Sequence, residues 1–88
     1  MTNTEKKLKL IYDEVKEIDR TNKYIVCSSV SGQRLYGIVD EHRREILPLN
    51  FVSINIRRRN TLAGIEIWAT VTDTNWHDFV CPVLQLDV

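Results

Sequence analysis

One stretch of the chain decides its fold: Leu35-Tyr36-Gly37-Ile38-Val39-Asp40, a charged turn, and then Glu45-Ile46-Leu47-Pro48-Leu49-Asn50-Phe51-Val52-Ser53-Ile54. Its apolar residues alternate, which is the pattern of a strand with one buried face. Gly37 and Pro48 fall where strands begin, bend or stop, because glycine has no side chain to pack and proline has no N–H group for a sheet ladder. Weaker copies of the pattern lie on either side. The sequence therefore predicts a repeated, mainly β fold.

Length and composition favour one small folded domain. The 88 residues leave room for a single domain, residues 1–88, with a small core and marginal stability. The fractions of hydrophobic (43%) and charged (27%) residues are those of a globular protein, not of a disordered chain. Twelve basic and twelve acidic residues cancel, so the long-range field of a general nucleic-acid binder is missing.

The sequence predicts a cytoplasmic protein. No apolar run of signal-peptide length follows Met1 to Lys7, and no stretch approaches the ~18–20 apolar residues of a membrane span. We therefore expect no membrane partner. The two cysteines, Cys27 and Cys81, are too few and too far apart for a secreted disulfide scaffold, and we expect both to be buried thiols.

The first segment, residues 2–18, is compatible with two structures. Thr2 and Glu5 match a helix capping box, and apolar residues recur at three- and four-residue steps, as on one face of a helix. Against a helix, apolar residues also alternate here, and Tyr12–Val15 is similar to Phe51–Ile54. A strand and an N-terminal helix, the latter giving an α+β fold, are both open.

Alternating segments separated by turn residues then predict antiparallel hairpins. Strands over Lys23–Val30 and Arg34–Asp40 are joined by a short turn at Gly32, where glycine takes positive φ without penalty. Pro48 is expected to mark the end or edge of the next short strand, and Arg57–Thr61 to form a charged loop. The remaining strands are expected over residues 49–56, 63–71 and 76–81.

These segments form a weak internal repeat. A first strand followed by a hairpin recurs at an offset of 39 to 41 residues, which divides the chain at about residues 10–48 and 49–88. We expect a small antiparallel sheet or an open barrel built from two hairpin repeats. The expected core residues are Tyr36, Ile38, Phe51, Ile67, Trp68, Val71 and Phe79.

The central repeat has the order aromatic, Gly, two apolar residues, Asp, polar turn, two apolar residues, Pro and a further aromatic. Residues 35–54 thereby resemble the bacterial WG (KWG) repeat. Tyr36 stands where Trp is usual and Arg44 where a turn Gly is usual, and residues 76–80 keep the aromatic but lack the Gly and Asp. The resemblance implies a β-rich, hairpin-based repeat with a binding role and offers no catalytic residues.

No motif indicates catalysis, so we expect neither an enzyme nor a cofactor. The sequence holds no Gly-rich elbow, phosphate loop or paired-carboxylate motif. His77 and Cys81 lie four residues apart, which in a strand separates them by ~13 Å, too far to share one metal ion. We expect no metal site.

Arginine provides the sharpest surface signal. Guanidinium groups suit bidentate contacts to phosphate or carboxylate, and two arginine groups near strand ends could form one patch beside His42. A solvated edge that keeps the sheet from aggregating is the simpler interpretation. The candidate binding residues are Arg43, Arg44, Arg57, Arg58 and Arg59.

Together these features predict a small protein–protein interaction module, such as an inhibitor or adaptor from a bacterium, phage or mobile element. Fewer than three repeats leave hydrophobic ends uncovered, which favours a homodimer. An N-terminal helix folded over the sheet is the alternative cover and permits a monomer. The competing function is a nucleic-acid-binding module that uses the arginine-rich segments.

Overall fold

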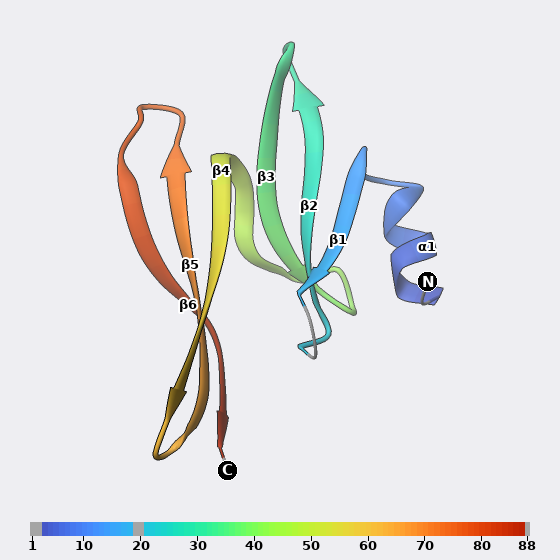
Figure 1. Cartoon of the computed structure of the whole chain (residues 1–88). Helices are drawn as coiled ribbons and strands as arrows, with labels where there is room; N and C mark the ends of the chain where they lie inside the picture. Colours follow the sequence, from blue (N-terminus) through green and yellow to red (C-terminus); the bar gives the residue numbers. More distant parts are fainter. Residues whose placement is uncertain (1–2, 19–20, 88) are drawn as a thin grey trace.

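The computed structural model describes residues 3–18 and 21–87, and the side chains of this range up to Val83. All its strands belong to one antiparallel sheet in which each strand pairs with its neighbours in sequence, in the order β1-β2-β3-β4-β5-β6 (Figure 1). The prediction of a mainly β, antiparallel fold is confirmed, and the N-terminal helix that the sequence left open is present. The elements are α1 (Asn3–Lys9), β1 (Glu14–Ile18), β2 (Lys23–Val30), β3 (Gln33–Asp40), β4 (Glu45–Thr61), β5 (Gly64–Asp73) and β6 (Asp78–Asp87).

The ambiguous N-terminal segment contains both predicted structures. The helix α1 ends at Lys9, and the carbonyl of Leu8 accepts the N–H groups of Ile11 and Tyr12, each at 2.9 Å. The chain then enters β1 at Glu14. The proposed cap Thr2 lies outside the described residues. The helical pattern thus corresponds to α1, and the alternating pattern corresponds to β1.

The hairpin of β2 and β3 is the most regular part of the sheet. Its register is unbroken from Lys23 opposite Asp40 to Val30 opposite Gln33. Ser31 and Gly32 connect the strands with φ values of 52° and 78°. Two successive positive φ values are typical of the type I′ turn, whose twist matches that of the flanking strands. The predicted hairpin is confirmed.

Strand β4 corrects two predictions made from the sequence. Pro48 does not end a strand, and Arg57–Arg59 do not form a loop, because β4 runs without a break from Glu45 to Thr61. Two extra residues of β4 lie between the pairs Ile38–Leu47 and Tyr36–Phe51, so Pro48 occupies a bulge, where its missing N–H group is tolerated. The arginines pair with β5, and this pairing holds them in the strand.

Gly37 lies directly beside the Pro48 bulge. A Cβ atom at this glycine would be 2.8 Å from the carbonyl oxygen of Leu47 and 3.0 Å from two backbone atoms of Pro48. The bulged backbone therefore occupies the space that any side chain at position 37 would need. The absence of a Cβ atom at Gly37 thus allows the bulged backbone at Pro48 to approach β3 this closely.

A second irregularity follows in β4 after Phe51, between the pairs Phe51–Asp73 and Ser53–Thr72. Figure 1 shows that β4 turns back near its middle, so that its first half runs beside β3 and its second half beside β5. Bulges are known to bend the strand that carries them. The sheet consequently folds over and encloses part of one of its own faces, which we call the inner face.

The sheet buries apolar residues on both sides. On the inner face the fully buried residues are Ile18, Ile38, Ile67, Ala69 and Val71. On the outer face, Leu8 of α1 packs against Tyr24, Val26 and Val39 of β2 and β3. The helix therefore covers the outer face of the first half of the sheet. No described helix covers the corresponding outer face of β5 and β6.

The expected core is partly confirmed. Ile38, Ile67 and Val71 are fully buried, and Tyr36, Phe51 and Trp68 are half-buried. The prediction for Phe79 is wrong, because its side chain is 48% exposed. Phe79 lies on β6, which pairs with β5 alone and forms an edge of the sheet, so no further strand covers it.

The hairpin of β3 and β4 and the hairpin of β5 and β6 have the same type of turn. The Asp40 carboxylate oxygen Oδ1 accepts the N–H groups of His42 (2.8 Å) and Arg44 (2.9 Å), and Asp73 Oδ1 accepts those of Asn75 (2.9 Å) and His77 (3.0 Å). Each turn then takes a left-handed residue, Arg43 (φ 64°) or Trp76 (φ 65°). The two aspartates are 33 positions apart (73 minus 40), a correspondence that the sequence comparison at 39 to 41 residues did not find.

Candidate interaction surface

The outer face of β4, β5 and β6 brings arginine and tryptophan together. Arg57 lies opposite Trp68 and Arg59 lies opposite Glu66, and directly opposed residues of antiparallel strands point to the same face. The indole N–H of Trp68 donates a hydrogen bond to Glu66 Oε2 at 3.1 Å.

This surface is hollowed and uncovered. Arg57, Arg59, Trp68, Thr70 and Val80 line a hollow of about 420 Å³, together with Arg58. Both Arg57 and Arg59 are exposed, and neither guanidinium group forms a salt bridge with a residue that the structure describes. By comparison, Arg34 pairs with Glu14 at 2.6 Å. The charges of Arg57 and Arg59 are therefore available to an external anion.

Arg58 differs from its neighbours. It lies opposite Ile67, on the inner face, because side chains alternate along a strand. There it lines a separate hollow of about 360 Å³ with residues of β1 and β2, including Glu17 and Ile25. Arg57 and Arg59 thus lie on the outer face of the sheet, and Arg58 lies on the inner face.

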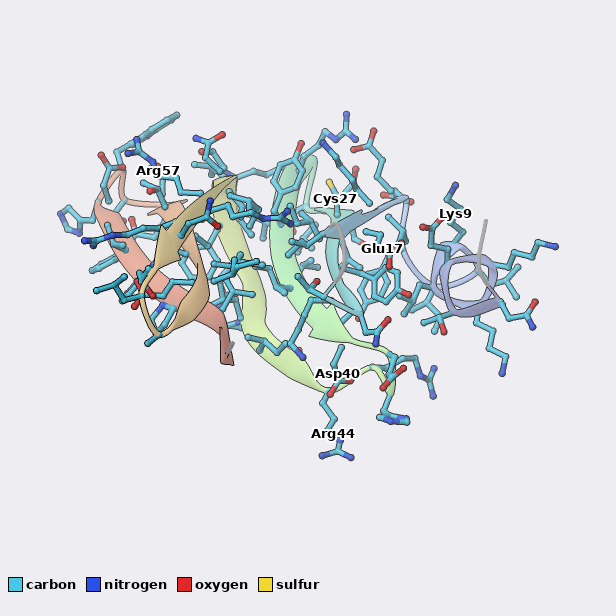
Figure 2. All side chains as sticks on the ribbon, turned by 60° about the horizontal axis from the view of Figure 1, so that its bottom comes forward. Lys9, Glu17, Cys27, Asp40, Arg44 and Arg57 are labelled. Carbon is cyan, nitrogen blue, oxygen red and sulfur yellow. The ribbon has the colours of Figure 1, made fainter. Side chains whose placement is uncertain are left out.

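Arg43 and Arg44 belong to another region of the molecule. Arg44 Nε is 3.9 Å from Asp40 Oδ2, and Arg43 lines a hollow of about 440 Å³ against α1 with His42 and Leu8. Figure 2 shows Arg44 and Arg57 on separate parts of the molecule. The two arginine groups do not form one patch. The left-handed turn residue, where the WG pattern favours glycine, is Arg43 instead of Arg44.

A polar row on the inner face was not found from the sequence. Glu14, Cys27 and Tyr36 lie opposite one another across β1, β2 and β3, beside a hollow of about 560 Å³. The hydrogen bond from Arg34 to Glu14 raises the pKa of the Arg34 guanidinium, and burial raises the pKa of Tyr36. These residues come from three strands, and only the register of the sheet brings them together.

The cysteines and other titratable groups show no metal centre. Cys27 is buried, as predicted, and Cys81 is half-buried; both are free thiols. Within residues 3–18 and 21–87, no three His, Cys, Asp or Glu side chains gather closely enough to hold a metal ion. None of the helical residues described forms a helix long and apolar enough to cross a membrane.

The hairpin of β5 and β6 exposes large apolar side chains. Trp76 is 77% exposed at the turn, and Phe79 and Val80 of β6 are 48% and 66% exposed. Trp76 itself has a left-handed backbone conformation, with φ 65°. These side chains lie along the edge strand and its turn, with Phe79 on the inner face and Val80 on the outer face, and we call this edge the β6 border (Trp76, Phe79, Val80).

Comparison with known proteins identifies no relative. No known protein family, curated protein or solved structure matches this chain. The resemblance of residues 35–54 to the WG repeat stays a prediction.

Proposed function

We propose that this protein is a non-enzymatic protein–protein interaction module that binds its partner through the β6 border. The observation that carries the proposal is the exposure of Trp76, Phe79 and Val80 beside a free sheet edge. Aromatic side chains contribute large areas to interfaces. Phe79 and Val80 lie on opposite faces of the edge strand, so a strand added at this edge would contact both. A free edge adds backbone donors and acceptors that another strand can use.

Variants of the β6 border test this proposal. The tagged protein is used to capture its partner from the source cell, and the partner is identified by mass spectrometry. Val80→Asp places a charge in the border and should reduce binding of that purified partner at least tenfold. Leu62→Asp is the matched control, because Leu62 is fully exposed at the turn between β4 and β5, away from the border. Equal binding by both variants would refute the assignment of the surface.

The proposal includes the cellular role expected from the sequence. This role is that of a cytoplasmic inhibitor or adaptor of bacterial, phage or mobile-element origin. A chain of this size is sufficient for such a role, which needs only one binding surface. Self-association is part of the same proposal, because the border that binds another protein is also available to a second copy. The WG-like hairpins, in this view, form a scaffold that presents the border.

A nucleic-acid-binding function is the second candidate, and a separate observation favours it. Arg57 and Arg59 flank Trp68 on the uncovered outer face, and single-stranded nucleic acids bind by phosphate contacts to arginine together with stacking of bases on aromatic rings. Binding to single-stranded DNA and RNA is measured by fluorescence anisotropy from 50 to 200 mM salt. Two phosphate contacts on a single strand give a log–log salt slope of about −1.4.

The arginines provide the control for this assay. Changing Arg57 and Arg59 to Ser should remove that salt-dependent binding, whereas changing Arg43 and Arg44 to Ser should leave it intact, since those residues lie elsewhere. Binding that survives the loss of Arg57, Arg58 and Arg59 together would eliminate the nucleic-acid candidate.

A further inference from the structure

We infer that β6 pairs with β6 of a second copy of this chain, antiparallel and about a two-fold axis at Val80. The inference rests on the proposed function, because it names one partner of the β6 border.

The hydrogen bonds of the last turn fix which backbone groups of β6 are free. The N–H of Asp73 donates to the carbonyl of His77 at 3.0 Å, so this pair lies at a hydrogen-bonded position of the ladder. Bonded and non-bonded pairs alternate along an antiparallel ladder. The pairs Val71–Phe79 and Ala69–Cys81 are therefore bonded ones.

The intervening pairs are non-bonded: Thr72–Asp78, Thr70–Val80 and Trp68–Pro82. The backbone groups of Asp78, Val80 and Pro82 consequently point away from β5, toward the free edge. Pro82 contributes only a carbonyl there, because it has no N–H group. The edge thus presents donors at residues 78 and 80 and acceptors at residues 78, 80 and 82.

This edge is complementary to itself when the two-fold axis passes at Val80. With the two-fold axis at Val80, the two Val80 residues exchange a pair of hydrogen bonds, and the N–H of each Asp78 donates to the carbonyl of Pro82 in the second copy. The central strand pair then has about four hydrogen bonds, by the alternation of an antiparallel ladder. An axis moved to Pro82 would remove the central donors, so the proline disfavours that register.

The side chains agree with this pairing. Phe79 of one copy lies opposite Cys81 of the other on the inner face, where Phe79 is half-exposed in the single chain and Cys81 already contacts the inner core. The second copy would supply the cover that Phe79 lacks. The two Asp78 residues lie at opposite ends of the pairing, and each is held by a hydrogen bond from Thr72 Oγ1 of its own chain at 2.7 Å.

The charges of the two edges favour β6 over β1. Three of the five residues of β1 are charged, Glu14, Lys16 and Glu17, and charged side chains discourage pairing at an exposed edge. The segment from Phe79 to Leu86 in β6 has no charged residue. A five-residue strand pairing with two aromatic rings buries less than the ~1,200 Å² of a standard interface, so we expect dissociation in the micromolar range.

Site-directed crosslinking tests this arrangement. The variant Val80→Cys with Cys81→Ser places two thiols opposite each other at the axis, where paired Cα atoms lie ~5.5 Å apart and a disulfide can form. Leu62→Cys with Cys81→Ser is the matched control with a fully exposed thiol far from β6. Under mild oxidation at 50 μM protein, we expect the Val80→Cys variant to crosslink at least tenfold faster.

Sedimentation of the unmodified protein completes the test. A species that shifts from 10.3 kDa toward twice that mass between 1 and 200 μM supports the inference. Equal crosslinking rates, or a single 10.3 kDa species throughout, would overturn it. If the protein is a monomer and its partner binding still depends on Val80, the dimer is refuted and the proposed function stands. If the protein is a dimer and its partner binding does not depend on Val80, the dimer stands and the proposed function is refuted.

Discussion

Replacement of Gly37 by alanine should destabilise the protein, although local preference favours the opposite result. Glycine inside a strand is about 0.5–1 kcal/mol less favourable than alanine, so an unobstructed site would gain stability. At position 37 the added Cβ would lie 2.8 Å from the Leu47 carbonyl oxygen and 3.0 Å from two backbone atoms of Pro48. Backbone atoms of a bulge cannot rotate away as a flexible side chain would.

Overpacking of this kind costs about 1–3 kcal/mol. In a domain of this size, 1 kcal/mol shifts the midpoint of thermal unfolding by about 4–8 °C, so we expect Gly37→Ala to lower the midpoint by about 4–24 °C. Circular dichroism during heating measures the shift. An unchanged or higher midpoint would show that the bulge does not press on Gly37 and would refute the reasoning.

Gly32 supplies the matched control. It has φ +78° and no atom within 4 Å of an added Cβ, so only its backbone conformation matters. Asparagine tolerates this left-handed region better than alanine does. We therefore expect Asn to be the better substitute at position 32 and the worse one at position 37, where the larger side chain increases the clash.

Further changes test the core and the turn. Phe51→Ala removes a half-buried ring that packs on the inner core, and it should lower the free energy of unfolding by about 3 kcal/mol. This loss is enough to unfold much of so small a domain. A thermal melt close to that of the parent would place Phe51 on the surface. Phe79→Ala should cost less than about 1 kcal/mol in dilute solution, because half of its ring is already exposed; a loss as large as that of Phe51 would contradict the edge position. The N–H groups of Arg44 and His42 lower the pKa of Asp40, chiefly through Arg44, so the folded state gains stability that is present above pH ~4 and is lost as the pH falls through the lowered value. Urea titrations between pH 6 and 2 should therefore show a smaller acid-induced loss of stability for Asp40→Ala than for the parent, and identical losses would exclude this contribution.

The parts of the fold that depend on local chemistry could be predicted from the sequence. The hairpin of β2 and β3 has alternating strands and a turn whose glycine sits where positive φ is needed, so every signal lies within eighteen residues (23 to 40). The mainly β class follows from the same alternation. The helix and β1 were each visible, although their two patterns overlapped in one segment.

The path of β4 depends on distant partners and could not be read locally. Proline and three consecutive arginines normally argue against a strand, yet β3 supplies the bulge at Pro48 and β5 supplies the ladder for Arg57–Arg59. The exposure of Phe79 likewise depends on strand order, because an edge strand and a central strand show the same alternation. For the outer face of β4 and β5, the sequence predicted the arginines as candidate binding residues, but it could not predict the pairing of Arg57 with Trp68.

The order of the strands in the sheet equals their order in the chain, which affects both the folding of the protein and the way in which its sheet can be extended by duplication. Each new strand adds to the one just formed through a connection of a few residues, so no step has to wait for a distant segment, and the entropy lost in closing each loop is small. Duplication of a segment that encodes one hairpin would extend the sheet at β6 without rethreading any existing strand. A chain of this design lengthens by whole hairpins, and each addition moves the free border outward to a new pair of strands.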